Sequence, residues 1–162
     1  MQLVISLKVL FLIAVANGAP LVAKRLLGSK LDHPVDGGAT LPDGQRLLGG
    51  AKTLRGVIAA LTATALAAPI VGFEMLTGAI LAAAAMAGDL CSSFAKRRLG
   101  LRASSKASGL DQVPEALLPA LAAMWLVGLT FVDVLVVTVL FTLANMLGSR
   151  VLFRLRLRDR PY

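Results

Sequence analysis

Acidic, hydroxyl and cationic side chains gather where one long apolar run of the sequence ends. The run covers residues 75–87, and the polar residues that follow it are Asp89, Ser93, Lys96, Arg97 and Arg98. A second acidic segment begins at Asp111, just before apolar sequence resumes. Carboxylates bind Mg²⁺, and lysine and arginine bind phosphate. The combination is typical of an enzyme that handles a nucleoside triphosphate beside a lipid.

The spacing of these residues favours one shared surface. On a continuing helix, Asp89 and Ser93 lie on one face, and Lys96 and Arg97 share that face with Ser93. Two simpler interpretations stay open. The cations mark the membrane surface and its anionic headgroups, and Asp89 pairs with a nearby arginine at a helix end. Asp111 also has a simpler interpretation, as the N-cap of the next helix.

A second cationic segment precedes another apolar run. Lys52, Thr53 and Arg55 lie at its start, and Gly49 and Gly50 come just before them. Backbone N–H groups of such glycines bind oxyanions. The Gly-Lys-Ser/Thr order of a phosphate-binding P-loop is absent from the sequence. The alternative is again that these cations only flank a membrane helix.

The composition indicates helices that cross a membrane. Hydrophobic residues make up 57% of the 162-residue chain, whereas soluble domains are nearer to roughly 45–50%. We therefore predict an all-α integral membrane protein that forms one domain, 1–162. About five transmembrane helices are expected, at 3–23, 54–73, 75–90, 116–131 and 133–153. Two functional loops are expected between them, at 24–53 and 91–115.

The distribution of charge predicts the orientation in the membrane. The formal net charge is +8, and every lysine and arginine except Lys8 lies in or beside the two long loops or near the C-terminus. Because positive residues stay cytoplasmic, we predict an outside N-terminus and cytoplasmic active-site loops in the plasma membrane. This explanation requires no nucleic acid, and no nucleic-acid partner is expected. No cation precedes the first apolar run, so we expect a retained helix rather than a cleaved signal peptide.

Isolated polar residues carry weaker signals. The single cysteine, Cys91, excludes an intramolecular disulfide and is expected to be a small packing residue. His33 is the only histidine, so the sequence supports neither a zinc site nor a Ser-His-Asp site. Glu74 and Asp133 are expected to be solvated at outer turns. Asn17 is expected to hydrogen-bond a neighbouring helix.

At the same residues the chain resembles a known family. Gly88-Asp89-Leu90-x-x-Ser93-x-x-Lys96-Arg97, followed by Leu110-Asp111, is similar to the signature region of CTP-dependent phosphatidate cytidylyltransferases. Further motifs resemble the CDP-archaeol synthase branch, and they extend over nearly the whole chain. These motifs are Asn17-x-x-Pro20, Pro34-x-Asp36-x-Gly38, Asp43-Gly44-x-Arg46-x-x-Gly49, Lys52-Thr53-x-Arg55-Gly56 and Asp111-Gln112.

The resemblance implies transfer of a cytidylyl group from CTP to a membrane lipid phosphate, giving a CDP-lipid and pyrophosphate. It implies Mg²⁺ as cofactor, bound by Asp89 and Asp111, and it implies that Lys96 and Arg97 hold the CTP phosphates. The implied catalytic residues are Asp89, Ser93, Lys96, Arg97 and Asp111. The implied substrate-binding residues are Lys52, Thr53, Arg55, Arg98, Gln112, Asp43 and Asn17. The implied partners are CTP, the lipid phosphate and membrane lipids, and a homodimer stays open.

The chain departs from the family pattern at two places. The broader family has a second acid three residues after Asp111, where this chain has Pro114 followed by Glu115. The archaeal branch often has an acid where this chain has Gly50. The metal shell is therefore expected to differ from that of the family. The lipid is left open between an archaeal-type ether lipid phosphate and a phosphatidate-like one, because the resemblance implies that the tail is bound loosely by apolar helices. Two rival functions stay open as well: a CDP-alcohol phosphatidyltransferase, and a non-enzymatic membrane protein or transporter.

Overall fold

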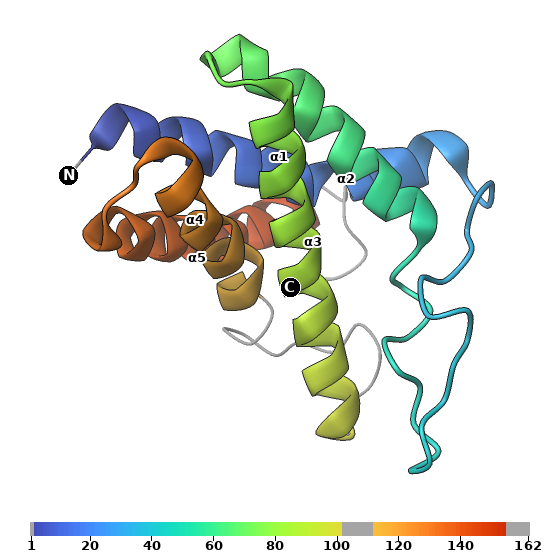
Figure 1. The fold of residues 1–162 in the computed structure, drawn as a ribbon. Helices are drawn as coiled ribbons and strands as arrows, with labels where there is room; N and C mark the ends of the chain where they lie inside the picture. Colours follow the sequence, from blue (N-terminus) through green and yellow to red (C-terminus); the bar gives the residue numbers. More distant parts are fainter. Residues whose placement is uncertain (1, 102–111, 155–162) are drawn as a thin grey trace.

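The computed structural model describes residues 2–101 and 112–154, with side chains through Gly148, and its regular elements in this part of the chain are helices. The elements are α1 (Leu3–Leu27), α2 (Leu54–Ala67), the 3₁₀ helix η1 (Ala68–Val71), α3 (Met75–Arg98), α4 (Gln112–Val127) and α5 (Phe131–Arg154) (Figure 1). Within the described residues, four segments are long and apolar enough to cross a membrane: α1, α2 with η1, α3, and α5 through Gly148. The shorter α4 is apolar too. The prediction of an all-α membrane architecture is confirmed.

The first helix is an integral part of the core. Val9, Leu12 and Ile13 of α1 are almost fully buried and pack in one cluster with residues of α3, α4 and α5. Leu81 of α3 and Val137 of α5 belong to the same cluster. Burial of these side chains holds α1 among the other helices, because packing and not hydrophobicity alone joins helices inside a membrane.

Glycines let α3 approach its two neighbours closely. A β-carbon on Gly78 would lie 2.5 Å from the backbone oxygen of Thr64 in α2. A β-carbon on Gly88 would lie 2.1 Å from the backbone oxygen of Pro114 in α4. Small residues at such crossings permit tight helix packing in membranes. The second crossing brings the start of α4, including Glu115, against the part of α3 that carries Asp89.

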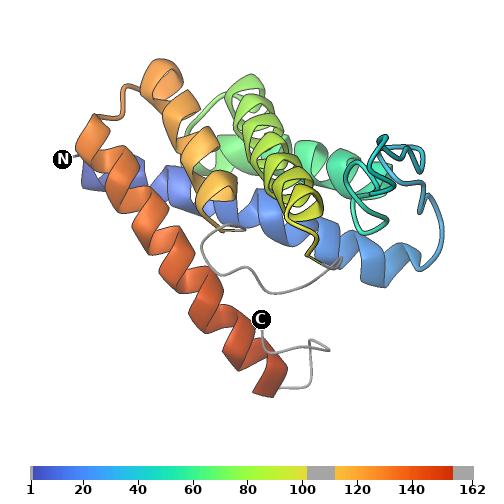
Figure 2. The same cartoon turned by 90° about the horizontal axis from the view of Figure 1, so that it is seen from below.

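The ends of the helices fall into two groups in space. In Figure 1 the N-terminus and the α4–α5 connection lie at the left and the α2–α3 connection at the top. The loop 28–53 and the end of α3 lie toward the bottom and right, and Figure 2 also places this loop away from the N-terminus. The loop 28–53 and the end of α3 therefore lie at one end of the helix bundle.

Several helix boundaries differ from the predicted ones. The third helix continues to Arg98, so the segment 91–98 is helical and is not part of a loop. The continuation keeps the residues from Asp89 to Arg97 in helical register. The fourth helix spans Gln112–Val127 instead of 116–131. Pro69 and Gly72, which has a φ of +81°, end the second span earlier than predicted.

Two of the isolated polar residues are not where the sequence placed them. Asp133 is completely buried, because its carboxylate accepts hydrogen bonds from Gln2 N (2.9 Å), Ser6 Oγ (3.2 Å) and Thr130 Oγ1 (2.6 Å). The prediction of a solvated Asp133 is wrong, since these donors replace water. Cys91 is exposed and is not a packing residue, because it lies on the outward face of the extended α3.

Candidate functional site

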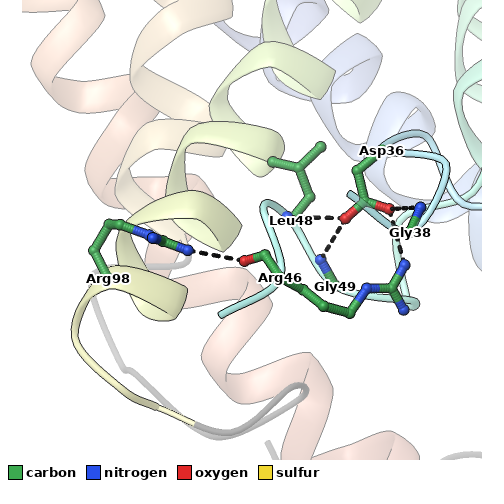
Figure 3. Close-up of polar contacts among 6 residues, drawn as sticks. All are labelled: Asp36, Gly38, Arg46, Leu48, Gly49 and Arg98. Carbon is green, nitrogen blue, oxygen red and sulfur yellow. Dashed lines mark hydrogen bonds and ion pairs between the residues drawn. The ribbon is translucent and has the colours of Figure 1, made fainter. Parts of the chain in front are cut away.

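The loop before α2 is organised around one buried carboxylate. Oδ1 of Asp36 accepts from Gly38 N (3.0 Å) and Arg46 Nη2 (2.9 Å). Oδ2 accepts from the backbone N–H groups of Leu48 (3.0 Å) and Gly49 (3.1 Å) (Figure 3). The Asp36 side chain has no exposed surface. Burial raises its pKa, but the bonds from Gly38, Leu48, Gly49 and Arg46 outweigh this effect and lower the pKa to about 2.

Arg98 fastens this loop to the last turn of α3. Its Nη2 donates to Arg46 O (3.0 Å), and its Nη1 pairs with the carboxylate of Asp43 (Figure 3 shows the first contact). The guanidinium also lies 5.3 Å from the centre of the Phe94 ring. The hydrogen bond from Gln45 N, together with Arg98, lowers the pKa of Asp43. These contacts therefore fasten the loop 28–53 to the end of α3.

A small polar cavity of about 60 Å³ lies between the loop and α3. Its lining residues are Leu48, Gly49, Ala51, Lys52, Ser93, Lys96 and Arg97. Ser93, Lys96 and Arg97 are each more than nine-tenths buried. Nε of Arg97 is buried without a hydrogen-bond partner among the described residues. Lys52, Lys96 and Arg97 bring positive charge to this lining, so the cavity is suited to an anion.

A second, larger cavity of about 830 Å³ adjoins the small one, and its lining combines polar and apolar side chains. The polar part includes Lys52, Thr53, Asp89, Glu115, Asn17 and Asn145. The apolar part includes Leu7, Leu10, Phe11 and Leu21 of α1 and Phe141 of α5. Such a cavity matches an amphiphile with a polar headgroup and an apolar chain. Ala51 and Lys52 line both cavities.

Lys52 lines both cavities and forms an ion pair with Asp89 of α3. Its Nζ lies 2.5 Å from Asp89 Oδ1, and both side chains are largely buried. Glu115 lines the same cavity as Asp89, and carboxylate oxygens are the ligands that Mg²⁺ prefers. Among the described residues no group of three or more His, Cys, Asp or Glu side chains forms a ready metal site. Asp89 and Glu115 are the carboxylates that line this cavity, so a Mg²⁺ bound here would have to take its remaining oxygen ligands from substrate phosphates or water.

The structure brings some of the predicted site residues together. Asp89, Lys52, Thr53 and Asn17 line the large cavity, and Ser93, Lys96 and Arg97 line the small one with Lys52. The α3 residues that were predicted to share one face, from Asp89 to Arg97, are thus divided between two cavities. The reason is that the loop 28–53 covers only the last turns of α3. Nδ2 of Asn17 donates to Ile13 O (3.0 Å) of its own helix, so the predicted bond to a neighbouring helix is wrong.

Other predicted site residues lie elsewhere. The buried Arg55 donates to Gly28 O (2.5 Å) and Lys30 O (2.9 Å) and pairs with Asp32 (2.8 Å). It therefore holds the end of α1 to the start of α2, outside the lining of either cavity. Gln112 begins α4 and is partly buried. Asp43 and Arg98 pair with each other, and Asp111 lies outside the described residues.

Two residues were not predicted to belong to the site. Asp36 was noticed only as part of a motif, and nothing in its local sequence shows that its carboxylate is enclosed by the loop. Asn145 of α5 also lines the large cavity. A polar amide within an apolar span is itself a signal of function, and this signal could have identified it.

Comparisons with known proteins agree with this geometry. A family model described as CarS-like, CDP-archaeol synthase, matches residues 1–74 and 69–162. The CDP-archaeol synthase of Aeropyrum pernix is 40% identical over 123 residues, which cover 72% of this chain and 67% of that protein. The CDP-archaeol synthase of Pyrobaculum islandicum is 34% identical over 154 residues, which cover 91% of this chain and 92% of that protein.

A solved structure extends the similarity to the fold. It is described as an intramembrane enzyme for archaeal membrane lipids biosynthesis, and it matches with a TM-score of 0.76 at 30% identity. The match covers 88% of this chain and 90% of that one. Sequence and fold agree over most of the chain, and the protein belongs to the CDP-archaeol synthase family.

Proposed function

We infer that this protein is a CTP-dependent cytidylyltransferase that acts on a membrane lipid phosphate, of the archaeal ether-lipid type, and releases a CDP-lipid and pyrophosphate. One observation of the structure carries this inference: a small cationic cavity and a large amphiphilic cavity share Lys52. Nucleotidyl transfer needs two phosphate-bearing substrates to meet at one point. A shared cationic residue between two cavities provides such a point.

The small cavity suits the triphosphate of CTP. Lys52, Lys96 and Arg97 supply positive charge there, and Ser93 supplies a hydroxyl. At about 60 Å³ the cavity is too small for a whole nucleotide, so we assign to it part of the phosphate chain. Charge-assisted hydrogen bonds to phosphate oxygens are the strongest that such side chains form.

The large cavity suits the lipid phosphate. Its polar part would hold the headgroup beside Lys52 and Thr53, and its apolar part between α1 and α5 would hold the start of the lipid chains. A phosphate monoester is already an anionic nucleophile at pH 7, so the reaction requires no strong base. The chemical difficulty is the approach of two anions, and closely placed cations reduce this cost.

The reaction is a substitution at the α-phosphorus of CTP. An oxygen of the lipid phosphate forms a new P–O bond to that phosphorus while the bond to the β-phosphate breaks, and pyrophosphate leaves. Lys52 aligns the attacking phosphate, while Lys96 and Arg97 stabilise the negative charge that grows on the leaving group. A bound Mg²⁺, held by Asp89 with Glu115 or Asp111, would supply further neutralisation of phosphate charge.

The position of the charged helix ends supports a cytoplasmic site. Lys24 and Arg25 end α1, and Lys96, Arg97 and Arg98 end α3. By the positive-inside rule, we propose that the loop 28–53 and both cavities open toward the cytoplasm, and that the N-terminus lies outside. CTP is water-soluble, so a cytoplasmic opening gives it direct access.

A substrate panel tests the proposed function. Purified protein would receive each nucleoside triphosphate with an ether-linked or an ester-linked lipid phosphate, and released pyrophosphate would be measured. We expect release only with CTP and a lipid phosphate, with Mg²⁺ present. If the protein instead released CMP from a CDP-lipid and an alcohol, it would be a phosphatidyltransferase. Inactivity in both assays would favour a non-enzymatic membrane protein.

A further inference from the structure

Asp36 is a buried acid that the proposed chemistry does not use. It is absent from the lining of both cavities, and its side chain is fully enclosed. Four donors from its own loop satisfy the carboxylate: Gly38 N, Arg46 Nη2, Leu48 N and Gly49 N. A buried carboxylate with this many directed bonds fixes the backbone that supplies them.

Two of these donors belong to the wall of the small cavity. Leu48 and Gly49 line it opposite Ser93 and Arg97 of α3. A β-carbon on Gly49 would lie 4.0 Å from Arg97 Cδ, so the loop backbone is in contact range of the Arg97 stem. Gly49 has a φ of +97°, a conformation that glycine adopts without strain. The two hydrogen bonds to Asp36 select that conformation.

We propose that Asp36 is a positioning residue for the CTP phosphates, acting by holding the Leu48–Gly49 backbone against Arg97. The inference rests on the proposed function, because it assigns the small cavity to CTP. Asp36 touches no substrate in this account. It maintains the width of the cavity and the placement of the Arg97 side chain.

The part of the loop that lines the large cavity is held by different hydrogen bonds. Lys52 O accepts from Val35 N (2.8 Å), and His33 O accepts from Leu54 N (2.9 Å). These two bonds hold the segment that carries Lys52 and Thr53 through His33 and Val35, while Lys52 N also donates to Gly49 O at the longer distance of 3.3 Å. Loss of Asp36 should therefore disturb the small cavity more than the large one, and so CTP more than the lipid.

The main test compares the two Michaelis constants in the full-length protein. Asp36→Asn should raise KM for CTP by about tenfold or more, because two charge-assisted bonds to the wall are weakened. KM for the lipid phosphate should stay within about twofold. Asp32→Asn is the matched control in the same loop: its exposed carboxylate pairs with Arg55, away from both cavities. It should leave both constants near the wild-type values.

Hydrogen exchange supplies a readout that does not depend on turnover. The Leu48 and Gly49 amides should exchange faster in Asp36→Asn, whereas the amides of Val35 and Leu54 should keep their wild-type rates. If Asp36→Asn does not fold, Arg46→Gln decides the matter, since it removes one partner of the carboxylate at a half-exposed position. It should raise KM for CTP by about two- to fivefold and leave the lipid constant unchanged.

Three outcomes would overturn the inference. One is a folded Asp36→Asn protein with an unchanged KM for CTP. Another is an equal rise of both constants in Asp36→Asn, or in Arg46→Gln where that variant decides, which would indicate general loosening of the loop. The third is a wild-type protein that does not use CTP. That outcome also ends the proposed function, whereas the first two leave it intact.

Discussion

The two cavities meet at Lys52 but are built in different ways. The small cavity has one wall of loop backbone, held by Asp36, and one wall of charged side chains from α3. The large cavity lies among the faces of membrane helices, and most of its lining is apolar. The difference corresponds to the two substrates. A nucleotide that comes from water requires its charge to be matched, whereas a lipid that stays in the membrane requires mainly room and one polar anchor.

The largest effect is expected at Asp89, because its carboxylate pairs with Lys52, the residue that lines both cavities. Asp89→Asn keeps the size of the side chain but removes its charge, both for Lys52 and for a metal. We expect turnover to fall by about 100-fold or more, by analogy with the loss of other charge-stabilising groups. Single-turnover pyrophosphate release would measure it. The control Glu74→Gln changes an exposed acid at the α2–α3 turn and should leave turnover unchanged.

The second metal ligand can be identified in the same assay. Glu115→Gln and Asp111→Asn each remove one acid near the start of α4. If Glu115 is the ligand, its variant should resemble Asp89→Asn, while Asp111→Asn stays near the wild type. The reverse result would restore the family pattern, with Asp111 as the ligand.

The next effect concerns the packing that joins Asp89 to Glu115. Gly88→Ala would place a β-carbon 2.1 Å from Pro114 O, a backbone atom that cannot easily move. We expect a loss of stability of about 1–3 kcal/mol and separation of the two acids. Thermal unfolding in detergent would measure it. Gly148→Ala in α5 is the control, since no atom lies within 4 Å of its added carbon, and an unchanged melting temperature in Gly88→Ala would contradict the close crossing.

Separate Michaelis constants for CTP and for the lipid phosphate distinguish the two cavities directly. Arg97→Gln should raise KM for CTP by about 10- to 150-fold, from the loss of about 1.5–3 kcal/mol for a charged contact, with little change for the lipid. Lys52→Gln should raise both constants, because Lys52 lines both cavities. If both variants affected only CTP, the large cavity would not be the lipid site.

The smallest effect is a dependence of stability on pH. The pKa of Asp36 is lowered from 3.8 to about 2, so its ionised form stabilises the folded loop. A lowered folded-state pKa gives stability that is complete above pH 4 and is lost as pH falls through about 2. The melting temperatures of wild type and Asp36→Asn should therefore converge as the pH falls from 4 to 2. Melting temperatures that change in parallel with pH would indicate that this carboxylate does not titrate there.

Much of the fold and part of the site could be predicted from the sequence. Apolar runs locate the helices, and helical spacing placed Ser93, Lys96 and Arg97 together, because both signals are local. The division of the polar α3 residues between two cavities could not be predicted. It depends on Lys52 reaching Asp89 and on Asp43 reaching Arg98, contacts between residues 37 and 55 positions apart. The burial of Asp133 was missed for the same reason, since its donors include Gln2 and Ser6 at the other end of the chain.

The bond between Gln2 and Asp133 also has a consequence for biosynthesis. The two residues are 131 positions apart, so α1 is synthesised well before α5, which supplies the carboxylate that secures its end. During that interval the polar groups of Gln2 and Ser6 lack the carboxylate that accepts their hydrogen bonds. A chain interrupted after α4 should consequently insert its first helix but fail to hold it, and such products should be recognised early by membrane quality control. Docking of the first turn of α5 onto the start of α1 is therefore expected to be a late step of assembly.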